Sequence, residues 1–235
     1  MKLGLAMLIF GLCAALPALA EENGKQPADP YLWLEDVTGA KPLEWVAAQN
    51  RRTTDELAQS AAFKTMNARF LDILNSTARI PYVEKIGDSY YNFWRDQDHE
   101  KGLWRRTTLA EYRKASPQWE TVLDLDALSM AEKVSWVFHG ASALPPDYSR
   151  CLLSLSRGGA DAAVVREFDL NTRSFVPGGF EIPESKSGMS WIDHDRVFVE
   201  FAFDSATMTT SGYPRIIKEW KRGTPLASAT PVFEG

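Results

Sequence analysis

The chain has 235 residues, and 45% of them are hydrophobic, so it has enough apolar surface for a substantial core and is not a disordered protein. Its net charge of -5 comes from interspersed acidic and basic residues, with no basic stripe of the kind that a phosphate backbone requires. Nucleic acid is therefore not an expected partner.

The N-terminal residues 1–20 predict a secretory signal peptide. Lys2 precedes an apolar run from Leu3 to Leu16, and Ala18-Leu19-Ala20 supplies a cleavage site of the small-x-small type. The run is shorter than the roughly 20 residues that a membrane-spanning helix needs. We expect cleavage after Ala20, export to the periplasm or the medium, and no membrane span in the mature chain. Residues 21–30 are expected to be a linker.

The cysteine content limits how the exported chain is stabilised. Removal of the signal peptide also removes Cys13 and leaves only Cys151, so no internal disulfide is possible. Cys151 lies in an apolar strand pattern, which favours a small buried thiol over a reactive one.

Residues 31–76 predict a helical segment. Apolar residues recur at helical spacing within Pro42–Gln59 and Ala61–Leu74, and Pro42 suits the first turn of a helix. Met66, Phe70 and Leu74 fall on one face of the second helix. We expect that face to be exposed unless another domain covers it.

After Ser76 the spacing of apolar residues changes to that of strands, and three sets of four strands are predicted in residues 77–235. The first set, within residues 80–126, is Ile80–Ile86, Ser89–Arg95, Leu103–Leu109 and Glu120–Leu125. The second set, within 133–183, is Lys133–Phe138, Cys151–Ser156, Ala162–Leu170 and Phe175–Ile182. The third set, within 187–235, is Met189–Ile192, Arg196–Phe203, Arg215–Trp220 and Pro231–Phe233.

The three sets predict a mainly β fold, a partial β-propeller of about three four-stranded blades. Their second strands begin about 45 to 60 residues apart, near the blade length expected of a propeller, whereas a sandwich has no such repeat. Three blades cannot close a ring, and a lone edge strand would remain at the last blade. We therefore expect this chain to be the first part of a longer architecture.

A search for catalytic, cofactor and metal residues identifies none. Gly140-Ala141-Ser142-Ala143-Leu144 is nearest to a nucleophile elbow, but Leu144 replaces the final glycine and Pro145-Pro146 forbids the helix that must follow. We interpret it as a loop between strands.

No metal-ligand spacing is found among the three histidines, His99, His139 and His194. The glycine pairs 158–159 and 178–179 lack the strand-to-helix context of a phosphate loop and are predicted to be turns.

The tryptophans allow two interpretations, a platform for carbohydrate or peptide or a set of core residues. Because most of them occur at strand spacing, we interpret them as blade core. The eight residues are Trp33, Trp45, Trp94, Trp104, Trp119, Trp136, Trp191 and Trp220.

Four motifs, in this order, carry a family resemblance. They are DPYLWLED from Asp29, EWVAAQNRRT from Glu44, SLSRGGAD with REFDLNTRSFVPGGF between Ser154 and Phe180, and TTSGYPRIIKEWKRGTPL from Thr209. Together they resemble the N-terminal region of the prolyl oligopeptidase family of serine peptidases. The likeness extends over nearly the whole mature chain.

The resemblance implies a seven-bladed propeller that covers an α/β-hydrolase catalytic domain and admits only short peptides. It implies that the helical segment packs on that domain, which is the expected intramolecular partner. The family's catalytic triad lies beyond the seventh blade, so no catalytic residue is carried onto this chain, and no activity of the chain alone is expected. The alternative is a stand-alone periplasmic binding protein that reuses propeller blades without catalysis.

Overall fold

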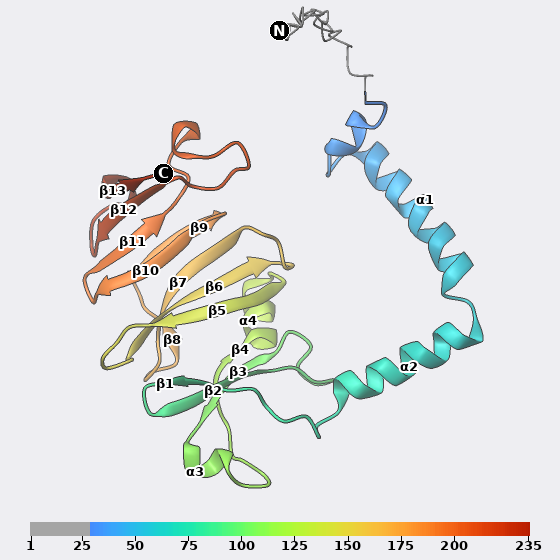
Figure 1. Ribbon diagram of the computed structural model, residues 1–235, viewed down its shortest axis with the longest axis horizontal. Coiled ribbons are helices and arrows are strands. Elements are labelled where there is room, and N and C mark those ends of the chain that lie inside the picture. The colour runs from blue at the N-terminus through green and yellow to red at the C-terminus, as the bar shows by residue number, and fades with distance from the viewer. Residues whose placement is uncertain (1–28) are drawn as a thin grey trace, which may run out of the picture. The chain divides into compact units, whose positions relative to one another are not determined.

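The computed structural model describes residues 29–235, in which helices come first and strands follow (Figure 1). The predicted signal peptide and most of the predicted linker lie outside the described residues. The chain divides into two compact units, Met1–Thr65 and Met66–Gly235, with the division inside the second helix. None of the helices within residues 29–235 has the length and apolar character that crossing a membrane requires.

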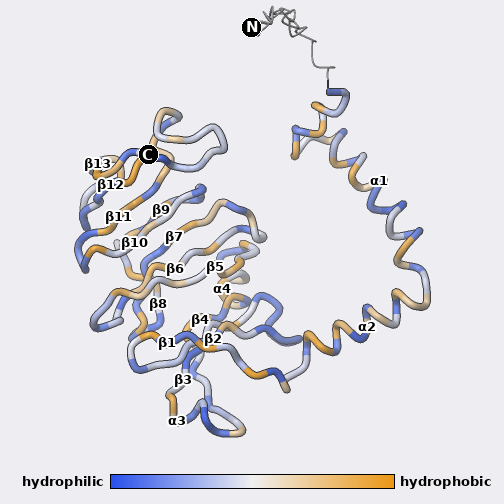
Figure 2. The backbone as a smooth tube through the Cα atoms, in the orientation of Figure 1, coloured by the Kyte–Doolittle hydropathy of each residue, from blue (hydrophilic) through white to orange (hydrophobic). Residues whose placement is uncertain are grey.

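The helical segment contains a 3₁₀ turn, η1 (Leu32–Glu35), followed by α1 (Ala40–Leu57) and α2 (Ala61–Asn75), close to the predicted bounds. The Ser60 hydroxyl accepts a hydrogen bond from the Phe63 amide (3.1 Å) and so caps the start of α2. Hydrophobic and hydrophilic positions alternate along both helices (Figure 2). Met66, Phe70 and Leu74 are exposed, in agreement with the predicted apolar stripe.

The rest of the chain forms three antiparallel sheets in sequence order (Figure 1). The first is a meander of β1 (Glu84–Ile86), β2 (Ser89–Trp94), β3 (Leu103–Thr107) and β4 (Glu120–Asp124). The second contains β5 (Trp136–Ala143), β6 (Arg150–Arg157), β7 (Ala163–Asp169), β8 (Ser174–Phe175) and β9 (Glu181–Ser185). The third is a meander of β10 (Gly188–Asp193), β11 (Arg196–Glu200), β12 (Ile216–Lys221) and β13 (Thr230–Glu234). The predicted mainly β fold with three blades is confirmed.

The structure has two short helices that the sequence pattern did not predict. The predicted strand Leu103–Leu109 ends at Thr107, because the Thr108 hydroxyl accepts from the Glu111 amide (3.2 Å) and starts α3 (Leu109–Tyr112). Similarly, the Asp124 carboxylate accepts from the Ala127 amide (2.9 Å) and starts α4 (Leu125–Glu132). In both cases a capping side chain stops a strand that the apolar pattern alone would continue.

The second sheet differs most from the prediction. The predicted strand Phe175–Ile182 is divided into β8 and β9, because Gly178 adopts a positive φ of 66° and turns the chain between them. Both pieces pair with β7, so this sheet has five strands where four were predicted. The predicted strand Lys133–Phe138 is also shifted and extends to Ala143.

The second sheet is buried on both faces. Cys151, Leu153 and Leu155 of β6 face Tyr91 and Trp104 of the first sheet in one core cluster. Leu152 and Val165, which point the other way, join Val197 and Val199 of the third sheet in a second cluster. Side chains alternate between the two faces of a strand, and a neighbouring sheet covers each face of the second sheet. The sequences of β6 and β7 are therefore nearly continuous runs of apolar residues.

An ion pair joins the second and third sheets. The Glu167 side chain is only 1% exposed, and its carboxylate accepts from both terminal nitrogens of Arg222, at 2.8 and 3.1 Å. It also accepts from the Phe180 amide (2.8 Å). Because a buried carboxylate without these donors would carry a large desolvation cost, the pair fixes how the two sheets face each other.

Replacing Arg222 by alanine should lower the free energy of unfolding by about 3 kcal/mol, because it leaves the Glu167 carboxylate buried without its main partner. Arg196→Ala is the matched control, since Arg196 pairs with the half-exposed Asp193 (2.7 Å) in the same sheet and should contribute at most about 1 kcal/mol. Urea unfolding followed by tryptophan fluorescence measures both variants. Equal losses in the two variants would contradict the role given to the Glu167–Arg222 pair.

The Cys151 thiol should be unreactive in the native chain. Its side chain is fully buried, and that burial raises the pKa of the thiol well above its usual value, so almost no thiolate forms near neutral pH. Titration with a chromogenic thiol reagent should detect the thiol only in denaturant. Rapid labelling of the folded chain would place Cys151 outside the core.

Candidate functional site

The stretch 140–144, nearest in sequence to a nucleophile elbow, is not one. Gly140 to Ala143 belong to β5 and pair with β6, so the prediction of a loop between strands was wrong. The Ser142 carbonyl accepts a hydrogen bond from the Trp191 indole (2.8 Å), and this bond links β5 to the third sheet. An elbow requires a sharp strand-to-helix turn, and an extended strand cannot provide it.

The three histidines lie apart, each beside a different partner. His99 contacts Asp96 (2.9 Å), and His194 lies 3.6 Å from Asp147. His139 shares a hydrogen bond with Ser156 (2.8 Å). Within residues 29–235 no group of three or more His, Cys, Asp or Glu side chains could hold a metal ion.

The His139–Ser156 pair has the distance of a base and its nucleophile, but it is not suited to acyl transfer. Ser156 is completely buried, so a substrate carbonyl cannot reach its hydroxyl oxygen. The nearby Asp161 carboxylate is bound instead by Lys186 (3.0 Å) and Tyr213 (2.8 Å). The pair therefore satisfies the buried Ser156 hydroxyl with an exposed histidine of β5.

Glycines at the two predicted turns adopt the conformations that such turns require. Gly158 and Gly159, between β6 and β7, have φ values of 61° and 84°, and Gly178 has a positive φ as well. No helix follows either pair directly, so neither has the geometry of a phosphate loop.

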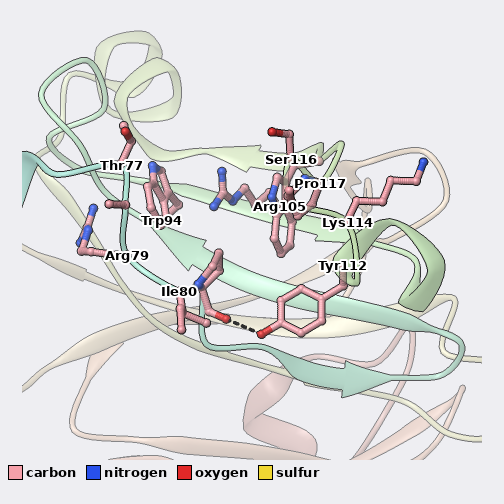
Figure 3. A pocket seen from close by; sticks show the side chains of 13 residues that line it. Thr77, Arg79, Ile80, Trp94, Arg105, Tyr112, Lys114, Ser116 and Pro117 are labelled. Carbon is pink, nitrogen blue, oxygen red and sulfur yellow. Dashed lines mark hydrogen bonds between the residues drawn. The ribbon is translucent and has the colours of Figure 1, made fainter.

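A cleft of about 670 Å³ lies on the first sheet, on the face directed away from the second sheet (Figure 3). Tyr91, Phe93 and Trp104 occupy the opposite face and pack in the core. The cleft is lined by residues 77–81 before β1, by Trp94 and Arg105 from β2 and β3, and by the segment from Tyr112 to Trp119. Its floor is thus a rigid sheet and its walls are loops.

Arginine and tryptophan side chains stack in this cleft. The Arg105 guanidinium carbon lies 4.4 Å from the centroid of the Trp94 ring and 4.3 Å from that of Trp119. The Arg79 guanidinium lies over the Trp94 ring as well, at 4.4 Å. Each such cation–π contact contributes on the order of 1 kcal/mol. Trp94 is consequently buried although no other sheet within residues 29–235 covers it.

Hydrogen bonds hold the stack in place. The Arg105 Nε donates to the Asn92 side-chain oxygen (3.0 Å), and the Asn92 amide donates in turn to the Tyr82 carbonyl (2.7 Å). The Trp94 indole donates to Asp96 (2.9 Å). Partial burial lowers the pKa of Arg105 to about 10, so the guanidinium stays charged at neutral pH.

The eight tryptophans differ in their surroundings, and Trp191 is partly buried against the second core cluster. Trp104, Trp136 and Trp220 are buried in the sheets, as predicted. Trp94 is buried as well, although it lines the cleft. The prediction of blade core was wrong for the half-buried Trp119, which lines the cleft, and for two tryptophans of the helical segment, Trp33 and Trp45, whose rings meet edge to face at 6.1 Å. The alternation of Trp94 with core-facing Phe93 indicates that Trp94 lies on the other face of the sheet, but it does not predict a cleft there.

Comparison with known proteins identifies the family. The family model "Prolyl oligopeptidase, N-terminal beta-propeller domain" matches residues 17–235. An uncharacterised peptidase of Sinorhizobium fredii is 40% identical over 225 residues, which are 95% of this chain and 31% of that protein. A prolyl endopeptidase of Elizabethkingia miricola is 28% identical over 74% of this chain and 23% of its own length.

Among solved structures, a post-proline cleaving enzyme from Rickettsia typhi matches with a TM-score of 0.81 and 31% identity. The match covers 86% of this chain and 30% of that enzyme. The chain thus spans about a third, or less, of the length of the relatives that it matches. These matches show that the chain belongs to the prolyl oligopeptidase family, and that its three sheets are blades of that family's N-terminal β-propeller domain.

Proposed function

We propose that this chain is the propeller portion of an exported prolyl oligopeptidase-like serine endopeptidase, whose blades restrict access of peptides to a catalytic α/β-hydrolase domain. The observation that carries the proposal is the face-to-face stack of three sheets, in which the middle sheet is buried on both sides. A stack that adds one blade per meander builds the wall of a propeller, and a wall around a channel admits small substrates while it excludes folded proteins.

The helical segment supports the presence of a further domain as a partner. Phe63, Met66, Phe70 and Leu74 of α2 all expose between 41% and 64% of their surface. A stripe of this size on one helix is typical of a surface that packs against protein. In the proposed architecture the catalytic domain covers it.

Peptide substrates and the catalytic reaction belong to the proposal for the whole protein. The relatives from Elizabethkingia and Rickettsia typhi are described as a prolyl endopeptidase and a post-proline cleaving enzyme. We extend that substrate class, peptides cut after proline, to the protein of which this chain forms the propeller portion. Export rests on the signal peptide predicted from residues 1–20.

The covering role can be tested in a chimera. Residues 77–235 of this chain replace the matching blades of the Rickettsia typhi enzyme, and cleavage after proline is compared for a chromogenic dipeptide and for an unstructured peptide of about 60 residues. The chimera should retain activity on the dipeptide and discriminate against the long peptide as strongly as the parent does, because the grafted blades restore the wall.

Two controls accompany the chimera. The 235-residue chain alone should not hydrolyse the dipeptide, and activity sensitive to a serine-directed reagent would show that the catalytic machinery lies in this chain. A deletion of the same blades from the parent should cleave both peptides with less discrimination. If the folded, active chimera cleaves the long peptide as fast as the dipeptide, the covering role is wrong.

A further inference from the structure

Two different kinds of polar contact join the second and third sheets, at opposite ends of their strands. Glu167 and Arg222 form the buried pair, which lies near the end of β7 and directly after β12. A second cluster consists of Asp161, Lys186 and Tyr213, which come shortly before β7, β10 and β12. The third sheet is therefore fastened to the second at both ends of these strands.

The second cluster joins three separate elements. The Lys186 ammonium lies 3.0 Å from Asp161, and the Tyr213 hydroxyl donates to the same carboxylate oxygen (2.8 Å). The ammonium also donates to the Ser211 carbonyl (3.3 Å) and lies 4.5 Å from the centroid of the Tyr213 ring. Asp161 follows β6, Lys186 lies between β9 and β10, and the other two residues belong to the loop between β11 and β12.

The loop between β11 and β12 has a fixed base and an exposed tip, residues 209–213. At the base, the Asp204 carboxylate accepts from the amide of Thr207 (3.0 Å), and Thr207 is buried. Most residues of the tip are exposed, and they are hydrogen-bonded to one another. Within residues 29–235, the hydrogen bonds that leave the tip end on Asp161 or Lys186. The position of the tip therefore depends on these two side chains.

The cluster differs from the Glu167–Arg222 pair in its exposure to solvent. The Asp161 side chain is 60% exposed and that of Lys186 is 34% exposed, whereas the Glu167 side chain is 1% exposed. Hydrogen bonds from Lys186 and Tyr213 lower the pKa of Asp161, so its carboxylate is charged at neutral pH. Dissolved ions screen exposed charges far more than buried ones. Salt should therefore weaken the cluster and leave the buried pair intact.

We propose that Asp161, Lys186 and Tyr213 form an electrostatic latch, which holds the tip of the β11–β12 loop on the second sheet and releases it when the ionic strength rises or Asp161 loses its charge. The two sheets stay packed when the latch opens, through the second core cluster and the Glu167–Arg222 pair. All of these contacts lie inside this chain. The proposal therefore requires no free surface and does not rest on the proposed covering role.

The backbone dynamics of the 235-residue chain test the proposal. Nitrogen-15 relaxation gives order parameters for the amides of residues 209–213 and for the Phe180 amide, which is bonded to Glu167 at the other end of the sheets. The screening length falls from about 30 Å at 0.01 M salt to about 3 Å at 1 M. Over this range we expect the order parameters of the tip to fall from about 0.85 to below about 0.6, while that of Phe180 stays unchanged.

Two variants with the same substitution separate the latch from a general effect of charge. Asp161→Asn should lower the order parameters of the tip at low salt to the values that the unaltered chain has at high salt, because the amide carries no charge to hold Lys186. Asp147→Asn is the matched control. Asp147 is also half-exposed and lies 3.6 Å from His194 of the third sheet, before β6 rather than after it. Its substitution should leave the tip and its salt dependence unchanged.

Three results would overturn the proposal. They are order parameters of the tip that do not fall between low and high salt in the unaltered chain, a tip that is as ordered in the folded Asp161→Asn variant as in the unaltered chain, and equal loss of order in the two variants. Because the salt comparison uses the unaltered chain, it decides the matter even if Asp161→Asn fails to fold.

Discussion

The second sheet is buried on both faces, and this burial determines how the first and third sheets pack. One antiparallel meander has two faces and can cover neither by itself, so β6 and β7 require a sheet on each side. Tyr91 and Trp104 supply one neighbour and Val197 and Val199 the other. The Glu167–Arg222 pair fixes the relative orientation of the second and third sheets, because its hydrogen bonds form in only one orientation.

The same packing explains where the polar side chains lie. Faces that are buried between sheets are filled by apolar side chains, and polar groups there, such as Ser156 and Glu167, are fully bonded. The outer face of the first sheet has no such neighbour among residues 29–235, and there the strands carry Asn92, Trp94 and Arg105.

More of the fold than of the candidate site could be predicted from the sequence. Strand positions followed from apolar periodicity, as for the predicted strand Cys151–Ser156, which the structure extends by one residue at each end. The errors occurred where a single side chain or glycine overrides the pattern, as with the caps Thr108 and Asp124 and the turn at Gly178. The cleft could not be predicted, since neither Trp94 nor Arg105 belongs to a motif. Trp94 and Arg105 come together because of the register between β2 and β3, and the segment before β4 places Trp119 against Arg105.

Amide hydrogen exchange across the 235-residue chain can show whether sheet-on-sheet packing stabilises the blades while the helical segment depends on a partner domain. We expect β6 and β7 to exchange most slowly, at the rate set by global unfolding, and α1 and α2 to exchange orders of magnitude faster because their apolar faces are uncovered. Protection of α1 and α2 equal to or greater than that of β6 and β7 would contradict this expectation.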